Sequence, residues 1–290
     1  MDEEIKSFED GLTARNLSKN TIHQYIKYLS AYAKHYGTLP DGEQNEIYKN
    51  IEDLQLIKKN KTPQKSTKAQ TLKAVCAYRN FKGLSNTELV KMYADVNRTA
   101  DADAKKRNEE LNEKLPSLSE HNKWVEELYD MNDAEKLRAY VINRLILNCY
   151  VRNQDLVADI ITKVGQLEKQ PADKNYLYIN KNQLTYGRRD YKTAKSYGEK
   201  VDVPAEKGHR IKMIKALRVV LKNSPNGNLI PEKEMKNLSN YIQEQTNGLG
   251  ETKLLKMSLK EKNNLANAVK IGKSRGTSVS TLQKHYNLVE

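Results

Sequence analysis

Cysteine and histidine are scarce in this chain of 290 residues, which has two cysteines and five histidines. Cys76 and Cys149 lie in the apolar settings "LKAVCAY" and "LILNCYV", and no CxxC motif occurs. We therefore predict that both are buried thiols, consistent with a reducing compartment, rather than a disulfide or metal ligands. The scattered histidines argue against a structural zinc, and no metal or cofactor is expected.

Long apolar runs are also missing. No stretch of about 18 consecutive apolar residues occurs, so no membrane span is expected. The N-terminus "MDEEIKSFED" is acidic, which argues against a secretory signal peptide or a transit peptide. Mean hydropathy is −0.83 and charged residues make up 30% of the chain, so we expect a soluble, intracellular protein without a membrane partner.

Positive charge is in excess, with a formal net charge of +13 and a pI near 9.4. The lysines and arginines are spread along the chain, which predicts a folded basic surface more than a disordered basic arm. Such a surface favours a polyanionic partner, and we predict a nucleic acid. The composition, rich in Lys, Asn and Tyr, is compatible with an AT-rich genome such as that of a large DNA virus or mobile element. Such a protein would work in the nucleus or cytoplasm of the host cell.

The pattern of apolar residues predicts two domains, 1–113 and 114–290. In the first, Ser18 is a plausible N-cap of a helix that Gly37 closes, and further helices follow. A charged tract from 97 to 114 has almost no apolar face and predicts a solvated helix or a linker. In the second, helices flank a single β region within residues 175–204. The expected fold class is mainly α with a small antiparallel β-sheet.

Arg152 stands out because it lies between the apolar runs "RAYVINRLILNCYV" and "LVADIITKV". A buried guanidinium must have a partner. That partner is either Asp155, in a structural ion pair, or a group that the protein binds. The other candidate functional residues are cations and one phenol, namely Lys192, Lys253, Lys256, Lys273 and Tyr286. Each could also have a purely structural role, since Lys253 and Lys256 could form a solvated helix face and Tyr286 could pack on a neighbouring residue.

The order of these segments resembles the tyrosine recombinase (phage integrase) family. "LSKNTIHQYIKYLSAYAKHYG" is similar to the N-terminal core-binding helices, and "YVRNQDLV" to the first catalytic box. "YKT" matches the position of the β-hairpin lysine, and "TKLLKMS" that of the His-x-x-Arg box. "IGKSRGTSVSTLQKHY" resembles the Gly-His-Ser segment that leads into the nucleophile. The resemblance spans nearly the whole chain, and the order of the motifs is hard to obtain by chance.

The resemblance implies a core-binding domain and a catalytic domain that form a C-shaped clamp on double-stranded DNA, with a dimer or tetramer on the DNA. Tyr286 would be the nucleophile that forms a 3′-phosphotyrosyl intermediate, without metal or ATP. Arginine suits the phosphate clamp, lysine the general acid, and Asp155 would buttress Arg152. Expected DNA contacts are Lys19, Lys27, Lys68, Lys73, Arg188, Arg189 and Arg275.

The sequence departs from the family pattern at two positions. Lys256 replaces the second clamp arginine, and lysine cannot bind two oxygens with the same rigid fork. Lys273 stands where histidine or tryptophan is usual, and the segment from it to Tyr286 is about four residues longer than the family pattern. Two interpretations therefore stay open, a working recombinase or integrase and an inactive recombinase-derived DNA-binding or structural (for example virion) protein. An enzyme of type IB topoisomerase kind shares the same chemistry.

Overall fold

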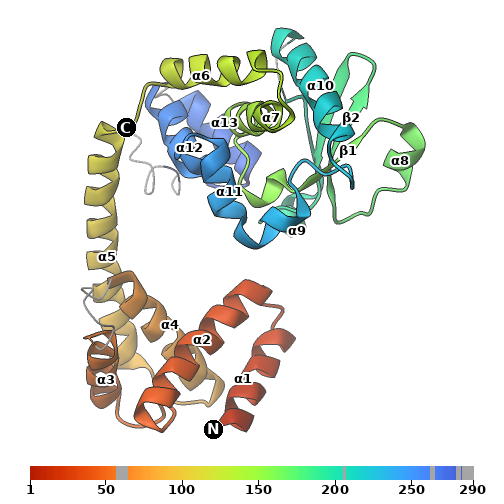
Figure 1. Ribbon diagram of the computed structural model, residues 1–290. Coiled ribbons are helices and arrows are strands. Elements are labelled where there is room, and N and C mark those ends of the chain that lie inside the picture. The colour runs from red at the N-terminus through yellow and green to blue at the C-terminus, as the bar shows by residue number, and fades with distance from the viewer. Residues whose placement is uncertain (57–64, 205–206, 262–264, 279–281, 283–290) are drawn as a thin grey trace. The chain divides into compact units, whose positions relative to one another are not determined.

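The computed structural model describes residues 1–56, 65–204, 207–261, 265–278 and 282 (Figure 1). The chain divides into two compact units, Met1–Arg107 and Asn108–Glu290. This division falls within helix α5 (Thr87–Glu113), whereas the boundary expected from the sequence lies after residue 113, at the end of that helix. The functional roles of the two units remain predictions.

Unit 1 is helical over its described residues. Helix α2 (Lys19–Tyr36) packs on α4 (Lys65–Phe81), with α1 (Asp2–Ala14) and α3 (Gln44–Leu56) beside them. The predicted limits of α2 are confirmed, because the Ser18 hydroxyl accepts a hydrogen bond from the Thr21 N–H at 3.2 Å and Gly37 adopts a left-handed φ of 70°. Residues 97–113 of the charged tract belong to α5, so the tract is helical rather than an irregular linker.

Unit 2 is built around helix α7 (Ala134–Cys149), which is buried over most of its length. It contacts α6 (Leu118–Asp130), α10 (Lys207–Lys222), α11 (Leu238–Gln245) and α12 (Gly250–Glu261) (Figure 1). Asp133 begins α7 by accepting the backbone N–H groups of Glu135 and Lys136. Helix α13 (Leu265–Arg275) follows, and the short helices are α8 (Val164–Glu168) and α9 (Ala194–Tyr197), with 3₁₀ turns at Gln154–Leu156 (η1) and Glu232–Asn237 (η2).

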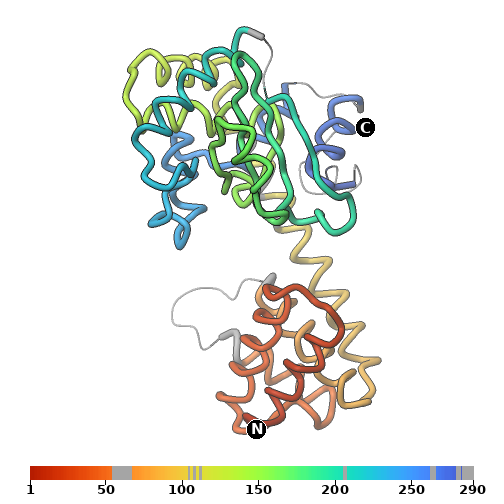
Figure 2. The backbone as a smooth tube through the Cα atoms, turned by 90° about the vertical axis from the view of Figure 1, so that its right-hand side faces the viewer, coloured from red at the N-terminus to blue at the C-terminus, as the bar shows by residue number. Residues whose placement is uncertain are grey.

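A four-stranded sheet flanks α7 and α10 (Figures 1 and 2). Its order is β1 (Ala158–Ile161), β2 (Asn175–Asn180), β3 (Gln183–Arg188) and β4 (Lys200–Asp202). The expectation of an antiparallel sheet is wrong for one pair, since β1 runs parallel to β2. β1 is a short strand within the apolar run "LVADIITKV". Its parallel pairing with β2 depends on the crossover through α8, and the spacing of apolar residues does not reveal such a pairing.

The inner face of the sheet joins the main core of unit 2. Leu177 pairs with Tyr186 and Ile179 with Leu184, and all four side chains are buried in that core. This packing fixes the register of β3, and therefore the position of Arg188 at its end. Cys149 is buried and Cys76 half-buried, and both are free thiols. None of the described helices combines the length and the apolar character that a membrane crossing requires.

Candidate functional site

The site lies where α7 ends. Tyr150 follows the helix with a left-handed φ of 50°, a conformation that is uncommon for residues other than glycine. Its side chain packs in a small core with Leu255, Leu259, Ile271 and Leu282, which holds this turn in place. The chain then buries Val151 completely and leaves Arg152 half-buried.

The end of α13 caps the end of α7. The Ser274 hydroxyl donates a hydrogen bond to the Cys149 carbonyl. The Arg275 guanidinium donates to the carbonyls of Tyr150 and Val151 at 3.1 and 3.3 Å. Its other terminal nitrogen pairs with Glu251 at 2.9 Å, and the second oxygen of Glu251 accepts the Asn153 N–H. The last carbonyl of α7 and the carbonyls of the two residues after it are thus hydrogen-bonded by the end of α13.

Arg152 makes the reciprocal contact. Its Nη1 donates to the Arg275 carbonyl at 2.7 Å and its Nη2 to the Thr277 hydroxyl at 2.8 Å. Asp155 accepts the backbone N–H of Arg152 at 3.1 Å. The guanidinium therefore binds the segment that leads toward Tyr286, a partner that neither sequence interpretation had named, whereas Asp155 supports the backbone of the arginine.

Arg188 lies beneath this contact with no exposed surface. It pairs with Asp202 at 2.7 Å, lies 3.5 Å from the Asp155 carboxylate, and donates to the Ser274 carbonyl at 3.0 Å. Burial raises the pKa of Asp155, and the hydrogen bond from the Arg152 N–H and the charge of Arg188 oppose that rise. These contacts join the ends of β3, β4 and α13 to the loop after α7.

Lys200 completes the group and was not predicted. It is the cross-strand partner of Arg188, and its Nζ donates to the carbonyls of Lys273 and Ser274 at 2.5 and 3.0 Å. Burial lowers the pKa of Lys200, and the charges of Arg188 and Arg152 lower it further. The alternation of β4 could have placed Lys200 and Asp202 on one face, but the segment holds several lysines and its register with β3 is not visible in the sequence. We call Arg152, Arg188, Lys200 and Arg275 the cation cluster.

The other predicted catalytic residues lie in different settings. The Lys273 side chain is exposed, and its carbonyl accepts the bond from Lys200. Lys192 is exposed on the segment between β3 and β4. Lys253 is half-buried and bonds to the Gly248 carbonyl at 3.2 Å, and Lys256 is 4% exposed within α12. Tyr286 lies outside the described residues, so its predicted role stays a prediction.

The predicted DNA contacts also divide by exposure. Lys19, Lys27 and Lys73 are exposed on α2 and α4. The ammonium of Lys68 pairs with Glu52 at 2.5 Å and lies 4.4 Å from the Tyr48 ring centroid, and its side chain is only 16% exposed. Arg189 pairs with Glu199 at 3.1 Å.

Two of these residues are buried. Arg188 has no exposed surface and Arg275 is 5% exposed, and both guanidinium groups bind carboxylates and carbonyls inside unit 2. These contacts hold the site together, and the DNA contacts expected of the two arginines stay predictions.

The cation cluster could stabilise an oxyanion at its surface. Its carboxylate partners are Asp155, Asp202 and Glu251, so its cations outnumber its nearby carboxylates, and the exposed Lys273 is adjacent. Half-exposed Arg152 and Lys200 are the members that an approaching phosphate could meet. Among the residues that the structure describes, no group of three or more His, Cys, Asp or Glu side chains could hold a metal ion.

Fold and site together define a mainly helical protein with a mixed four-stranded sheet and a cluster of buried and half-buried cations at the sheet edge. A solved structure described as the crystal structure of XerA recombinase is similar to this chain at 15% identity and a TM-score of 0.36, covering 100% of this chain and 94% of that one. A likeness at this level does not establish a shared activity. No protein-family model matches the sequence, and no curated protein matches it.

Proposed function

We propose that this protein binds double-stranded DNA and that unit 2 holds a backbone phosphate beside the cation cluster, where Tyr286 cuts and rejoins the strand. One observation carries the proposal. The Arg152 guanidinium is bonded to Arg275 and Thr277, which are 123 and 125 residues further along the chain. The segment that resembles the first catalytic box is thus joined to the segment that precedes the candidate nucleophile.

The proposed chemistry needs fixed positive charge, one acid and one nucleophile. The Tyr286 hydroxyl would give its proton to water as its oxygen attacks the phosphorus, the bond from phosphorus to the 5′ oxygen would break, and a 3′-phosphotyrosyl bond would remain. Arg152 would neutralise the non-bridging oxygens. A lysine ammonium would protonate the leaving 5′ oxygen. Lys192 is the acid expected from the resemblance, and Lys200 is a second candidate because its pKa is lowered.

A second candidate function is DNA binding without strand cleavage. It is favoured by the segment "TKLLKMS", which resembles the His-x-x-Arg box. Here Lys256 is 4% exposed within α12 and Lys253 bonds to the Gly248 carbonyl. A clamp lysine in those positions would have to leave its helix environment to touch a phosphate. In this version the cation cluster would bind the DNA backbone and Tyr286 would have no chemical role.

A nicked suicide duplex distinguishes the two functions. The full chain is incubated with the labelled duplex, and covalent adducts are separated on a denaturing gel. Cleavage predicts an adduct that the wild type and Tyr197→Phe form and that Tyr286→Phe does not. Tyr197 is a suitable control because its side chain is 62% exposed and close to the same segment.

The other outcomes are equally informative. Salt-sensitive duplex binding without an adduct in any variant would favour the non-cutting function. An adduct that persists in Tyr286→Phe would remove Tyr286 as the nucleophile. Absence of duplex binding at low salt would contradict both functions.

A further inference from the structure

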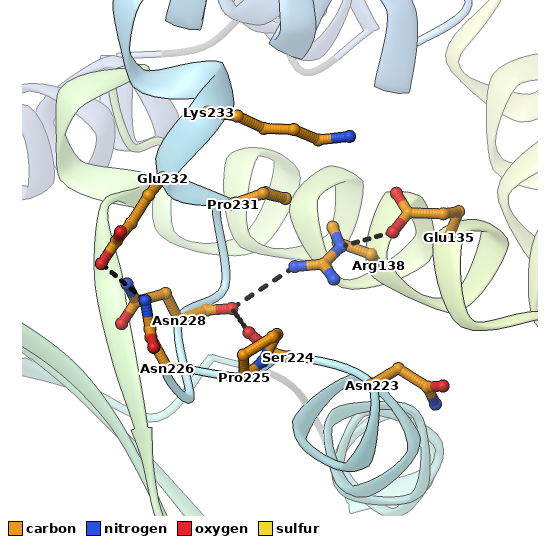
Figure 3. Close-up of a pocket in the computed structure, with 10 residues that line it drawn as sticks. All are labelled: Glu135, Arg138, Asn223, Ser224, Pro225, Asn226, Asn228, Pro231, Glu232 and Lys233. Carbon is orange, nitrogen blue, oxygen red and sulfur yellow. Dashed lines mark hydrogen bonds and ion pairs between the residues drawn. The ribbon is translucent and has the colours of Figure 1, made fainter.

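A cavity of about 360 Å³ lies in unit 2, apart from the cation cluster (Figure 3). The start of α7, the end of α10 and the segment 223–233 surround it. Its walls carry the amides of Asn223, Asn226 and Asn228, and charged groups of both signs. This volume is within the range of small-molecule sites, roughly 300–1,000 Å³.

Arg138 lies at the centre of the lining residues in Figure 3 and is 2% exposed. One terminal nitrogen, Nη1, donates to the carbonyls of Leu229 and Asn228 at 2.5 and 3.3 Å. On the opposite edge of the guanidinium, Nε is buried without a hydrogen bond, and Nη2 has no partner among the described residues. A nearly buried arginine thus has one edge satisfied by the fold and one edge that the fold leaves open.

Glu135 covers that open edge only loosely. Its Oε1 lies 3.4 Å from Nε, too poorly placed for a hydrogen bond, and the glutamate side chain is 59% exposed. Because Nε and Nη2 point in the same direction, they form a planar fork that fits two oxygens of one carboxylate or phosphate group. Glu135 can turn toward solvent and leave the fork to an incoming oxyanion.

The lining charges limit what that oxyanion can belong to. Arg138 and Lys233 are balanced by Glu135 and Glu232, so a polyanion such as DNA gains no net attraction. The amide nitrogens of Asn223 and Asn226 already donate to the Val219 carbonyl and to Glu232, so the amide oxygens are what these side chains offer to a neutral polar remainder. We propose that this cavity binds a small molecule that carries one carboxylate or phosphate group, held on the Nε–Nη2 edge of Arg138.

The test uses isothermal titration of the full chain with sodium acetate and with inorganic phosphate, at constant ionic strength. Saturable binding is expected for at least one probe, and the stronger probe identifies the oxyanion class. Glu135→Gln removes the competing carboxylate and should tighten binding about threefold. Glu127→Gln makes the same change of charge on an exposed residue of α6 and should leave the affinity unchanged.

Arg138→Lys removes the fork and should abolish saturation. If that variant does not fold, comparing the affinities of Glu135→Gln and Glu127→Gln still tests whether the oxyanion binds at Arg138. Equal affinity in those two variants would overturn the proposal, as would absence of saturation by both probes. Phosphate bound at the cation cluster instead would give equal affinities and is therefore recognised. None of these results depends on whether the protein binds or cuts DNA.

Discussion

Three arginines meet at the end of α7, and each uses its guanidinium differently. Arg275 donates to the carbonyls of the two residues after α7 and pairs with Glu251. Arg188 pairs with Asp202, and Arg152 bonds to the Arg275 carbonyl and the Thr277 hydroxyl. Arg152 alone of the three is half-buried rather than buried. The two buried arginines therefore position the one that can approach a ligand.

Lys256 gives a prediction about pH and stability. Burial lowers its pKa in the folded protein, so between that lowered value and the unfolded value near 10.4 the unfolded chain binds more protons. The free energy of unfolding should therefore rise with pH in this window, by at most about 1.4 kcal/mol per pH unit. In Lys256→Met this part of the slope should disappear.

Urea unfolding of the full chain at a series of pH values above neutrality measures the effect. Lys123→Gln is the control, because Lys123 is exposed on α6 and its loss should leave the slope unchanged. Parallel stability profiles for the wild type and Lys256→Met would mean that Lys256 reaches solvent in the folded protein. In that case Lys256 could reach a phosphate, and DNA cleavage would gain support over DNA binding alone.

At the scale of elements, the site depends on a close approach between the end of α13 and the segment joining β3 to β4. Gly276 has a φ of 60°, and a Cβ atom there would lie 2.0 Å from the Thr193 hydroxyl oxygen. Gly276→Ala should therefore suffer both left-handed strain of about 1–2 kcal/mol and a steric clash. We expect lower stability and weaker duplex binding, because the bonds of Arg152 on either side of Gly276 would shift.

Gly248→Ala separates the two effects. Gly248 has a φ of 75° with nothing within 4 Å of an added Cβ, so this variant has the strain without the clash. Thermal unfolding should show a smaller loss for Gly248→Ala than for Gly276→Ala. Equal losses would mean that the segment at Thr193 yields easily and does not hold the end of α13.

Local signals predicted the elements whose limits are set locally. Ser18 and Gly37 begin and end α2 as the sequence indicates, because capping depends on residues within one turn. The sequence missed β1 and Lys200, since a parallel pairing and a cross-strand neighbour depend on distant segments. It also identified Arg152 as unusual but not its partners, which lie more than a hundred residues away.

At the scale of the whole molecule, the net charge is +13, but the cations that produce it differ in their surroundings. Some are exposed, and others pair with carboxylates of the same chain. Each phosphate that a protein cation neutralises makes the slope of log affinity against log salt more negative by about 0.9. A residue that contacts a phosphate can therefore be distinguished from one that only adds to the overall field. Exposure in the structure predicts which residues belong to the first kind.

Unit 1 supplies a matched pair for this measurement. Lys27 is exposed on α2, whereas the Lys68 ammonium is held by Glu52 at 2.5 Å and its side chain is 16% exposed. Lys27→Gln and Lys68→Gln remove the same charge. If unit 1 contacts the DNA backbone through its exposed lysines, Lys27→Gln should make the salt slope shallower by about 0.9, and Lys68→Gln should leave it unchanged.

Fluorescence anisotropy with one labelled duplex at a series of salt concentrations measures both slopes, after circular dichroism has shown that each variant is folded. Unchanged slopes in both variants would mean that unit 1 does not contact phosphates through Lys27. An equal change in both would mean that the Lys68–Glu52 pair opens on DNA, since a lysine that stays paired releases no counterion when the duplex binds. The slope thus reports on direct contact, which the overall charge of the sequence cannot do.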